Sequence, residues 1–398
     1  MTAARLDLGD LGLDAGGHLL LRRALAALRV GQRLAVGGRD PALPVHLAAW
    51  CRAEGHRLEV SDRAPVGRFD AVIVRGERAD LRWLGAVRAG ETGTVRTRPP
   101  AVWGMAARGA LLEAGGPEPH FDLDDRDLVW ADVAPQLYAH AAARQWDPAT
   151  AVPWDEPFTL AEDVEAAVVQ VMTYLVENEQ IALLVPARFL GRIHPHFREV
   201  LQLLAVQVAD EARHMEVFTR RALLRHNAMG TSGAAGRASL FTLVEESDFS
   251  LASFLLSVLG EGTFVDLLGF IATHAPDPVT RQVTTLAMQD ERRHVLFGVA
   301  HLAQRAALEP RLRDRLRAAV EHRYDALRDT TGLNTDVFDA LVVLAAGDWT
   351  PEAIRTGYLR VRQLEHQMDD GRRRRLERLG FPADEAAQLS ALHTRNFM

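Results

Sequence analysis

One heptapeptide pattern occurs twice in this chain, and it constrains the fold more than any other feature. Residues 208–214 read VADEARH and residues 288–294 read MQDERRH, so both contain Asp-Glu-x-Arg-His. Both copies lie in long apolar stretches that favour helix. Because residues three apart share a helix face, each Glu-x-x-His directs a carboxylate and an imidazole to the same point. Such a ligand pair suits a divalent transition metal such as iron or manganese.

Each copy follows a helical stretch that carries one more glutamate on its apolar face. Apolar side chains recur every three or four residues in 159–188, and Glu179 falls on their face. Glu261 interrupts a similar apolar stripe in residues 240–274. An ionised carboxylate that is buried without a partner is strongly unfavourable, and a metal ion is one partner that offsets this cost.

The spacing of the four glutamates fits two antiparallel helical hairpins. Glu179 precedes Glu211 by 32 residues, and Glu261 precedes Glu291 by 30. Each hairpin would contain one helix with a single glutamate and one helix with Glu-x-x-His. Two such hairpins would hold two metal ions. The alternative without a metal is a bundle whose polar residues pair among themselves.

This constellation resembles the ferritin-like di-iron carboxylate superfamily over about residues 156–305. The resemblance implies a four-helix bundle around two iron ions, and manganese or a mixed pair would share the same ligands. The ligands that it implies are Glu179, Glu211, His214, Glu261, Glu291 and His294. The four glutamates would also be the catalytic residues, because they would bridge and neutralise the two metals that react with O2.

The aspartate and the arginine of each motif are expected to support the ligands. Asp210 and Asp290 lie four residues before their motif histidines. In the superfamily, such aspartates hydrogen-bond the free ring nitrogen of a ligand histidine, usually one on the other hairpin. We place Arg213 and Arg293 in the same supporting layer.

The composition is that of an ordinary soluble protein, with 48% hydrophobic residues, 25% charged residues and a net charge of −7. This balance does not indicate a nucleic-acid partner. Because no apolar run is long enough for a membrane helix and no signal peptide opens the chain, we expect a cytoplasmic protein without a membrane partner. The single cysteine, Cys51, excludes intrachain disulfides, and we expect it to be a small core residue.

Residues 1–76 alternate strand and helix signals in the order β-α-β-α-β-β, which predicts a small two-layer sandwich. Residues 34–58 resemble the TusA-like sulfur-carrier fold. That family carries sulfur on a cysteine in a Cys-Pro-x-Pro motif at the start of its first helix. The matching position is Ala15 and both prolines are absent, so we predict that this domain positions or covers the bundle and moves no sulfur.

Residues 77–155 are predicted to be a connector with a helical lead-in. We expect a helix over 103–113 and a second over 125–145, kinked or split at Pro135. Two tryptophans close the connector and are predicted to plug the end of the bundle, with a substrate role as the alternative; they are Trp146 and Trp154.

Residues 156–398 are predicted to form the dimetal helical domain. The sequence patterns predict four metal helices and three further ones, over 159–190, 198–228, 240–274, 278–308, 311–329, 334–346 and 351–379. His194 and His196 lie in the first hairpin loop, and we expect them to be solvated. The run Arg372 to Arg375 is interpreted as a solvated, ion-paired helix face.

Two substitutions relative to related subfamilies indicate the kind of oxidation. Radical-generating relatives keep a tyrosine one turn after the first Glu-x-x-His, where this chain has Phe218. Arylamine N-oxygenase relatives add a histidine where it has Ala287. We therefore predict a two-electron oxygenation or desaturation of a bound substrate without a stored radical. Apolar residues would line its pocket and select an apolar or amphiphilic substrate, namely Phe218, Phe264 and Leu268.

The predicted fold class is mostly α, a ferritin-like four-helix bundle with extra C-terminal helices, preceded by a small α/β two-layer domain. The predicted function is oxidation of a small organic substrate at a di-iron centre, with O2 as co-substrate. Iron oxidation and storage, or a non-catalytic metal-binding or regulatory module, are the alternatives. The sequence leaves an electron-donor protein and a homodimer open as partners.

Overall fold

The computed structural model describes residues 4–61, 65–225, 228–327 and 335–393. The chain divides into two compact units. The first contains Met1–Thr92 and Ala106–Pro117, and the second contains Gly93–Met105 and Glu118–Met398. The three domains inferred from the sequence, with boundaries near residues 76 and 155, stay a prediction.

The first unit is built on a mixed four-stranded sheet. In spatial order its strands are β1 (Ala4–Asp7), β2 (Arg33–Gly38), β4 (Phe69–Val74) and β3 (Arg57–Val60). Strand β2 is parallel to β1, and β4 is antiparallel to both of its neighbours. A π-helical turn (η1, Leu13–Gly17) precedes α1 (His18–Ala26), and α2 (Leu43–Glu54) follows β2.

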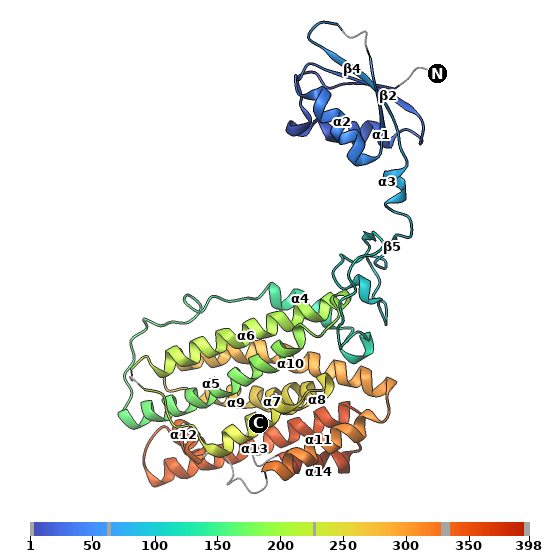
Figure 1. Cartoon of the computed structure of the whole chain (residues 1–398). Coiled ribbons are helices and arrows are strands. Elements are labelled where there is room, and N and C mark those ends of the chain that lie inside the picture. The colour runs from blue at the N-terminus through green and yellow to red at the C-terminus, as the bar shows by residue number, and fades with distance from the viewer. Residues whose placement is uncertain (1–3, 62–64, 226–227, 328–334, 394–398) are drawn as a thin grey trace. The chain divides into compact units, whose positions relative to one another are not determined.

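Apolar side chains of α1 and α2 form one core with those of β2 and β4. Both helices lie beside the sheet (Figure 1). The small α/β layer predicted from the sequence is therefore confirmed, whereas the TusA-like resemblance stays a prediction. Cys51 belongs to this core, and burial raises the pKa of its thiol to about 11, which suits a packing role.

The connector contains one predicted helix that the structure does not form. Residues 103–113 were expected to be helical, but only a 3-10 turn (η2, Ala101–Trp103) is present before β6 (Leu111–Leu112). Strand β6 pairs antiparallel with β5 (Val87–Arg88), which follows the short helix α3 (Arg78–Leu81). Gly109 has a φ of +88°. This left-handed conformation is incompatible with a continuous helix and allows the turn into β6.

The second connector helix is shorter than predicted. Within 125–145, a 3-10 turn (η3, Arg126–Leu128) precedes α4 (Ala134–Ala142). Pro135 lies in the first turn of α4, where its missing N–H removes no helical hydrogen bond. It therefore begins α4, and the predicted helix is split before Pro135 and is not kinked at it.

The second unit is a helical bundle, in agreement with the predicted fold class. Its metal helices are α5 (Glu162–Leu190), α6 (Arg198–Ala222), a continuous segment of α8 (Phe249–Ser253), η5 (Phe254–Glu261) and α9 (Gly262–His274), and α10 (Pro278–Leu308). Helix α5 packs along α6, and α10 packs on η5, α9 and α6 (Figure 1). The short turn η4 (Pro195–Phe197) joins α5 to α6.

The third metal helix begins later than predicted. Residues 240–274 were expected to be one helix, but α7 (Ala234–Glu245) ends before a break. Asp248 then accepts hydrogen bonds from the backbone N–H groups of Ser250 and Leu251 and so starts α8 as its N-cap. The stretch Phe249–His274 is long and apolar enough to cross a membrane, but 78% of its most apolar window is buried in the bundle, as in a core helix.

Within residues 312–327 and 335–393, the structure describes four helices after the metal helices: α11 (Leu312–Leu327), α12 (Thr335–Ala346), α13 (Pro351–Arg378) and α14 (Ala383–His393). Helix α13 packs on α9 and α12. The predicted solvated face at Arg372 to Arg375 is wrong for two of its residues. Arg372 is buried and Arg375 is partly buried, because positions three apart share the face that α13 turns to α9. Arg373 is half-buried and pairs with Asp369.

The histidines of the first hairpin loop are also buried, which corrects their predicted exposure. His194 is 1% exposed and His196 is 5% exposed. The ring of Trp103 lies against His196, and the N–H of Arg96 donates to its Nε2 at 3.0 Å. Residues 93–105 therefore cover the loop, a long-range contact that the local sequence does not indicate.

Candidate metal centre

The six predicted ligands lie in the middle of the bundle, between two apolar cores. Along α5, apolar residues before Glu179 belong to one core cluster and those after it belong to the other. The same change of cluster occurs at Glu261 and at the Glu-x-x-His of α6 and α10. All six side chains are at most 2% exposed. Polar groups at this depth need strong partners.

The ligands form two overlapping groups. The first contains Glu179, Glu211, His214 and Glu291, and the second contains Glu211, Glu261, Glu291 and His294. Within each group, one ligand atom from every residue lies within 4.8 Å of the others. Each group thus offers three carboxylates and one imidazole. Glu211 and Glu291 belong to both groups and can bridge two ions.

The imidazole Nδ1 atoms point into the carboxylates. His214 Nδ1 lies 3.1 Å from Glu211 Oε2, 3.3 Å from Glu291 Oε1 and 3.5 Å from Glu179 Oε1. His294 Nδ1 lies 3.0 Å from Glu211 Oε1 and 3.2 Å from Glu291 Oε2. A ring nitrogen carries at most one hydrogen, so it cannot satisfy this many oxygens. A cation bound between these atoms would satisfy all of them.

The carboxylates themselves show the same deficit. Among the residues that the structure describes, one oxygen of each glutamate is buried without a hydrogen-bond partner: Glu179 Oε1, Glu211 Oε1, Glu261 Oε2 and Glu291 Oε1. Each such atom costs free energy in a protein interior. The donor set of buried carboxylate oxygens and imidazole nitrogens therefore fits two iron or manganese ions.

The pKa values report the same crowding of charge. Burial raises the pKa of Glu179 and of Glu261 well above the ordinary carboxyl value. Burial acts in the same direction on Glu211, but the adjacent imidazoles outweigh it and lower its pKa. Burial acts to lower the pKa of His214 and His294, yet the surrounding carboxylates raise both well above the ordinary value.

Each ligand histidine is held by an aspartate of the other hairpin. His214 Nε2 lies 3.2 Å from Asp290 Oδ2, and His294 Nε2 lies 3.2 Å from Asp210 Oδ2. When Nε2 donates to the aspartate, the lone pair of Nδ1 is free to bind metal. Burial acts to raise the pKa of both aspartates, but their hydrogen bonds to the imidazoles help to lower it.

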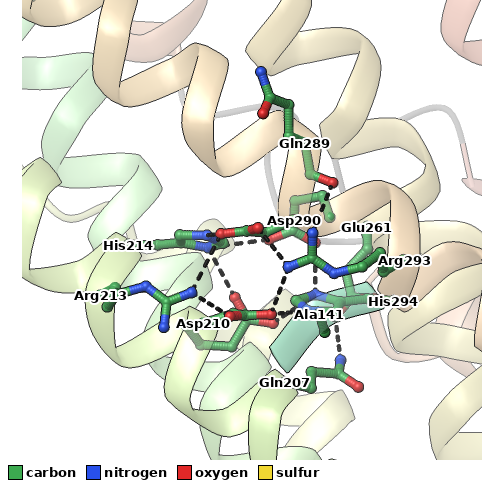
Figure 2. A network of polar contacts seen from close by, with 12 residues as sticks. Ala141, Gln207, Asp210, Arg213, His214, Glu261, Gln289, Asp290, Arg293 and His294 are labelled. Carbon is green, nitrogen blue, oxygen red and sulfur yellow. Dashed lines mark hydrogen bonds and ion pairs between the residues drawn. The ribbon is translucent and has the colours of Figure 1, made fainter. Parts of the chain in front are cut away.

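The two motif arginines join these aspartates. Arg293 Nη2 donates to Asp210 Oδ2 at 3.0 Å and also to Asp290, and Arg213 Nη2 contacts Asp210 and lies 3.4 Å from Asp290 Oδ2. Figure 2 shows the two aspartates between the two arginines. These aspartates and arginines thus link the two hairpins, and their ion pairs do not involve the four glutamates that could bind metal.

Trp146 and Gln145 belong to this network, and the sequence did not indicate it. Trp146 Nε1 donates to Asp290 Oδ2 at 2.7 Å, and its ring stacks on His214 with centroids 6.4 Å apart. Gln145 Nε2 donates to Asp210 Oδ1 at 3.2 Å. The predicted end plug therefore describes Trp154, which is 7% exposed, better than Trp146.

Gln207 and Ser257 were also missed, although a local signal exists for both. Each lies four residues before a ligand glutamate on the same helix, hence on the same face. Gln207 Nε2 donates to Glu261 Oε1 at 3.1 Å, and a hydrogen bond with Ser257 acts to lower the pKa of Glu261.

A small apolar cavity adjoins this side of the centre. It offers about 20 Å³, room for roughly one water molecule. Its lining is formed by Val185, Pro186, Phe189, Leu204, Gln207, Phe249, Ser253, Leu256, Ser257 and Phe297. The predicted pocket residues do not line it in the described part of the chain. Phe218, Phe264 and Leu268 are buried in the core cluster that contains the α5 residues before Glu179, whereas the apolar lining of the cavity belongs to the other cluster.

No protein-family model matches the chain, and no curated protein matches it. A solved variant of an R2-like ligand-binding oxidase with an aerobically reconstituted Mn/Fe cofactor is 16% identical, and the match covers 62% of this chain and 93% of that chain with a TM-score of 0.48. The R2-like ligand-binding oxidase from Sulfolobus acidocaldarius is 15% identical over 60% of this chain and 91% of that chain, with a TM-score of 0.42. At these values the assignment of the centre depends on its own residues.

Proposed function

We propose that this protein is an O2-dependent oxidoreductase with two iron ions that oxidises a small organic substrate. The observation that carries the proposal is the pair of overlapping ligand groups that share Glu211 and Glu291. Glu211 and Glu291 would hold both ions, which in their reduced form would supply two electrons for one O2 molecule. Manganese or a mixed pair fits the same ligands.

The charge of the ligands supports two divalent ions. The four ligand glutamates, when ionised, balance the charge of two divalent cations, so the filled centre would be neutral in an apolar interior. Asp210 and Asp290 would keep each Nε2–H of the imidazoles engaged, and each Nδ1 would then remain a ligand. The surrounding apolar cores would exclude water from the reacting atoms.

The residues around the centre favour direct oxidation of a bound substrate. Phe218 follows His214 by one turn, with ring centroids 6.3 Å apart, and a phenylalanine cannot store a phenoxyl radical. Phe189, Phe249 and Phe297 line the cavity beside Glu261, so we assign substrate entry to this side. Because the cavity has room for roughly one water molecule, an organic substrate would bind here only after side chains of the lining move. An apolar substrate would suit this lining, and its oxygenation or desaturation is the reaction that we propose. A separate electron-donor protein would restore the reduced centre after each turnover.

O2 consumption by the iron-loaded protein tests this function. Protein loaded anaerobically with Fe(II) should consume about one O2 per chain in a single rapid phase, while Glu211→Ala should consume almost none. Iron uptake in large excess over the protein would instead support iron storage. Failure to consume O2 with two irons bound would support a non-catalytic metal-binding module.

A further inference from the structure

The third metal helix has a π-helical hydrogen-bond pattern over the eight residues that end at Glu261. Residues Phe254–Glu261 form the π-helix η5, and all eight are buried. In a π-helix each turn contains extra backbone, and such turns are rare and often occur at functional sites. Because a return to regular α-helix would rotate the residues on either side of the turn relative to each other, the direction of the Glu261 carboxylate depends on η5.

Two carbonyl groups of η5 accept hydrogen bonds from side chains. The Val258 carbonyl accepts from Arg375 Nε at 2.7 Å, and the Leu259 carbonyl accepts from Thr263 Oγ1 at 2.7 Å. Arg372 Nη1 in turn lies 3.4 Å from Thr263 Oγ1. Both arginines lie on α13, outside the metal helices. Helix α13 therefore contacts the π-helical turn directly through Arg375 and indirectly through Arg372.

The space for Arg375 exists because residue 262 is a glycine. A Cβ at Gly262 would lie 2.5 Å from Arg375 Cζ and 2.8 Å from Nη2. Such distances are too short, so any side chain at this position would displace the guanidinium. Gly262 directly follows Glu261, which places the guanidinium next to the backbone of a predicted ligand.

Burial of these two arginines is unfavourable by itself. Desolvation lowers the pKa of Arg372 and of Arg375 to about 10, values at which both remain cationic near neutral pH. An apolar side chain could fill the same space without this cost. Donation to the Val258 carbonyl of η5 is the interaction that the Arg375 guanidinium provides and an apolar residue does not.

We propose that Arg375 is a positioning residue for Glu261, acting through the Val258 carbonyl and the space at Gly262 to keep η5 in its π-helical register. The inference rests on the proposed metal centre, since Glu261 is part of the second ligand group only. Loss of the contact would move one carboxylate and spare the group that contains Glu179.

The first readout is amide hydrogen exchange of residues 254–262 in the metal-free protein. Arg375→Met and Gly262→Ala should each speed exchange there by about tenfold or more, because both remove the contact that holds the turn. Arg373→Met is the matched control, since it removes the same charge from a half-buried position of α13 whose ion pair is with Asp369 of the same helix, and it should leave exchange in η5 unchanged. Arg375→Lys should restore part of the protection through a single donor.

The second readout is the metal content of the same variants at limiting Mn(II). Arg375→Met and Gly262→Ala should retain about one ion per chain where the wild type and Arg373→Met retain about two. Gly262→Ala keeps the test decisive if Arg375→Met does not fold. Wild-type exchange in both variants, or faster exchange with two ions still bound, would overturn the proposal. A wild type that binds no metal would overturn the metal centre as well.

Discussion

The two helix pairs of the centre carry the same Asp-Glu-x-Arg-His pattern, but they position their upstream glutamates by different means. Glu179 lies within α5, a single helix of 29 residues. Glu261 lies at the end of the π-helix η5. Glu261 accepts a hydrogen bond from Gln207, and the backbone before it is held by a helix outside the bundle core. The repeated motif therefore predicts equivalent ligands, while the local backbone makes the two positions inequivalent.

This comparison assigns different roles to the ligands. Glu211 and Glu291 belong to both groups, whereas Glu179 and Glu261 each belong to one. The two groups thus share the glutamates of the repeated motif, whereas each glutamate that precedes a motif belongs to one group only.

The largest effect is expected from the shared glutamates. Glu211→Ala or Glu291→Ala removes a carboxylate from both groups, so metal content after reconstitution should fall from about two ions per chain to nearly none. Elemental analysis measures the metal content, and an unchanged far-ultraviolet circular dichroism spectrum shows that the variant is folded. Retention of two ions in either variant would contradict the assignment.

A smaller loss of metal is expected when a glutamate that belongs to only one group is replaced. Glu179→Gln and Glu261→Gln each replace an anionic ligand of a single group by a neutral amide, so each variant should bind about one ion, and the double variant should bind almost none. Stepwise titration with Mn(II) and detection of free Mn(II) by spin resonance gives the stoichiometry. If one of the two single variants bound two ions normally, that glutamate would not be a ligand.

The supporting aspartates should act across the pairs. Asp290 contacts His214 and Asp210 contacts His294, so Asp290→Asn should weaken the ion of the first group and Asp210→Asn that of the second. The expected loss of affinity is about 10- to 100-fold. Each substitution is measured in the Glu179→Gln and Glu261→Gln backgrounds, where only one group can bind. An effect of Asp290→Asn confined to the group of His294 would contradict the crossed arrangement.

The smallest effect concerns the metal-free protein. The pKa values of Glu179, Glu261, His214 and His294 are raised in the folded state above 4.5 for the carboxyls and 6.5 for the imidazoles. Between these values and the folded-state values, the folded protein binds more protons than the unfolded one, so its stability falls as pH rises.

The midpoint of thermal unfolding should therefore drop by a few degrees between about pH 5 and about pH 8 in metal-free protein, measured by calorimetry. Glu261→Gln should reduce this dependence, because its amide does not titrate. Saturation with Mn(II) should reverse the trend, since metal competes with protons for the same atoms. A metal-free protein that becomes more stable over this range would contradict the pKa directions.

The sequence predicts most of the ligand chemistry because helical periodicity is a short-range property. The spacing of Glu211 and His214, and of Glu291 and His294, determines which side chains share a face wherever the helix packs. The stripe around Glu179 carries the same information. The structure accordingly places all six predicted residues together.

The features that sequence reasoning missed depend on contacts between distant segments. Trp146 reaches Asp290 from a lead-in without helical periodicity, and His196 is covered by residues from about a hundred positions upstream. The π-helical hydrogen-bond pattern of η5 cannot be recognised in its sequence, because residues 254–260 are nearly all apolar and do not distinguish a π-helix from an α-helix. The side of the centre that adjoins a cavity depends on how Phe189, Phe249 and their neighbours fill space, which a hydrophobic pattern does not specify.

Anomalous diffraction from crystals grown with Mn(II), recorded on both sides of the manganese absorption edge, tests the central claim most directly. We predict two peaks about 3.5–4 Å apart, both between Glu211 and Glu291. One should lie beside His214 Nδ1 and Glu179, and the other beside His294 Nδ1 and Glu261. A single peak, or no peak among these six side chains at saturating metal, would contradict the dimetal centre.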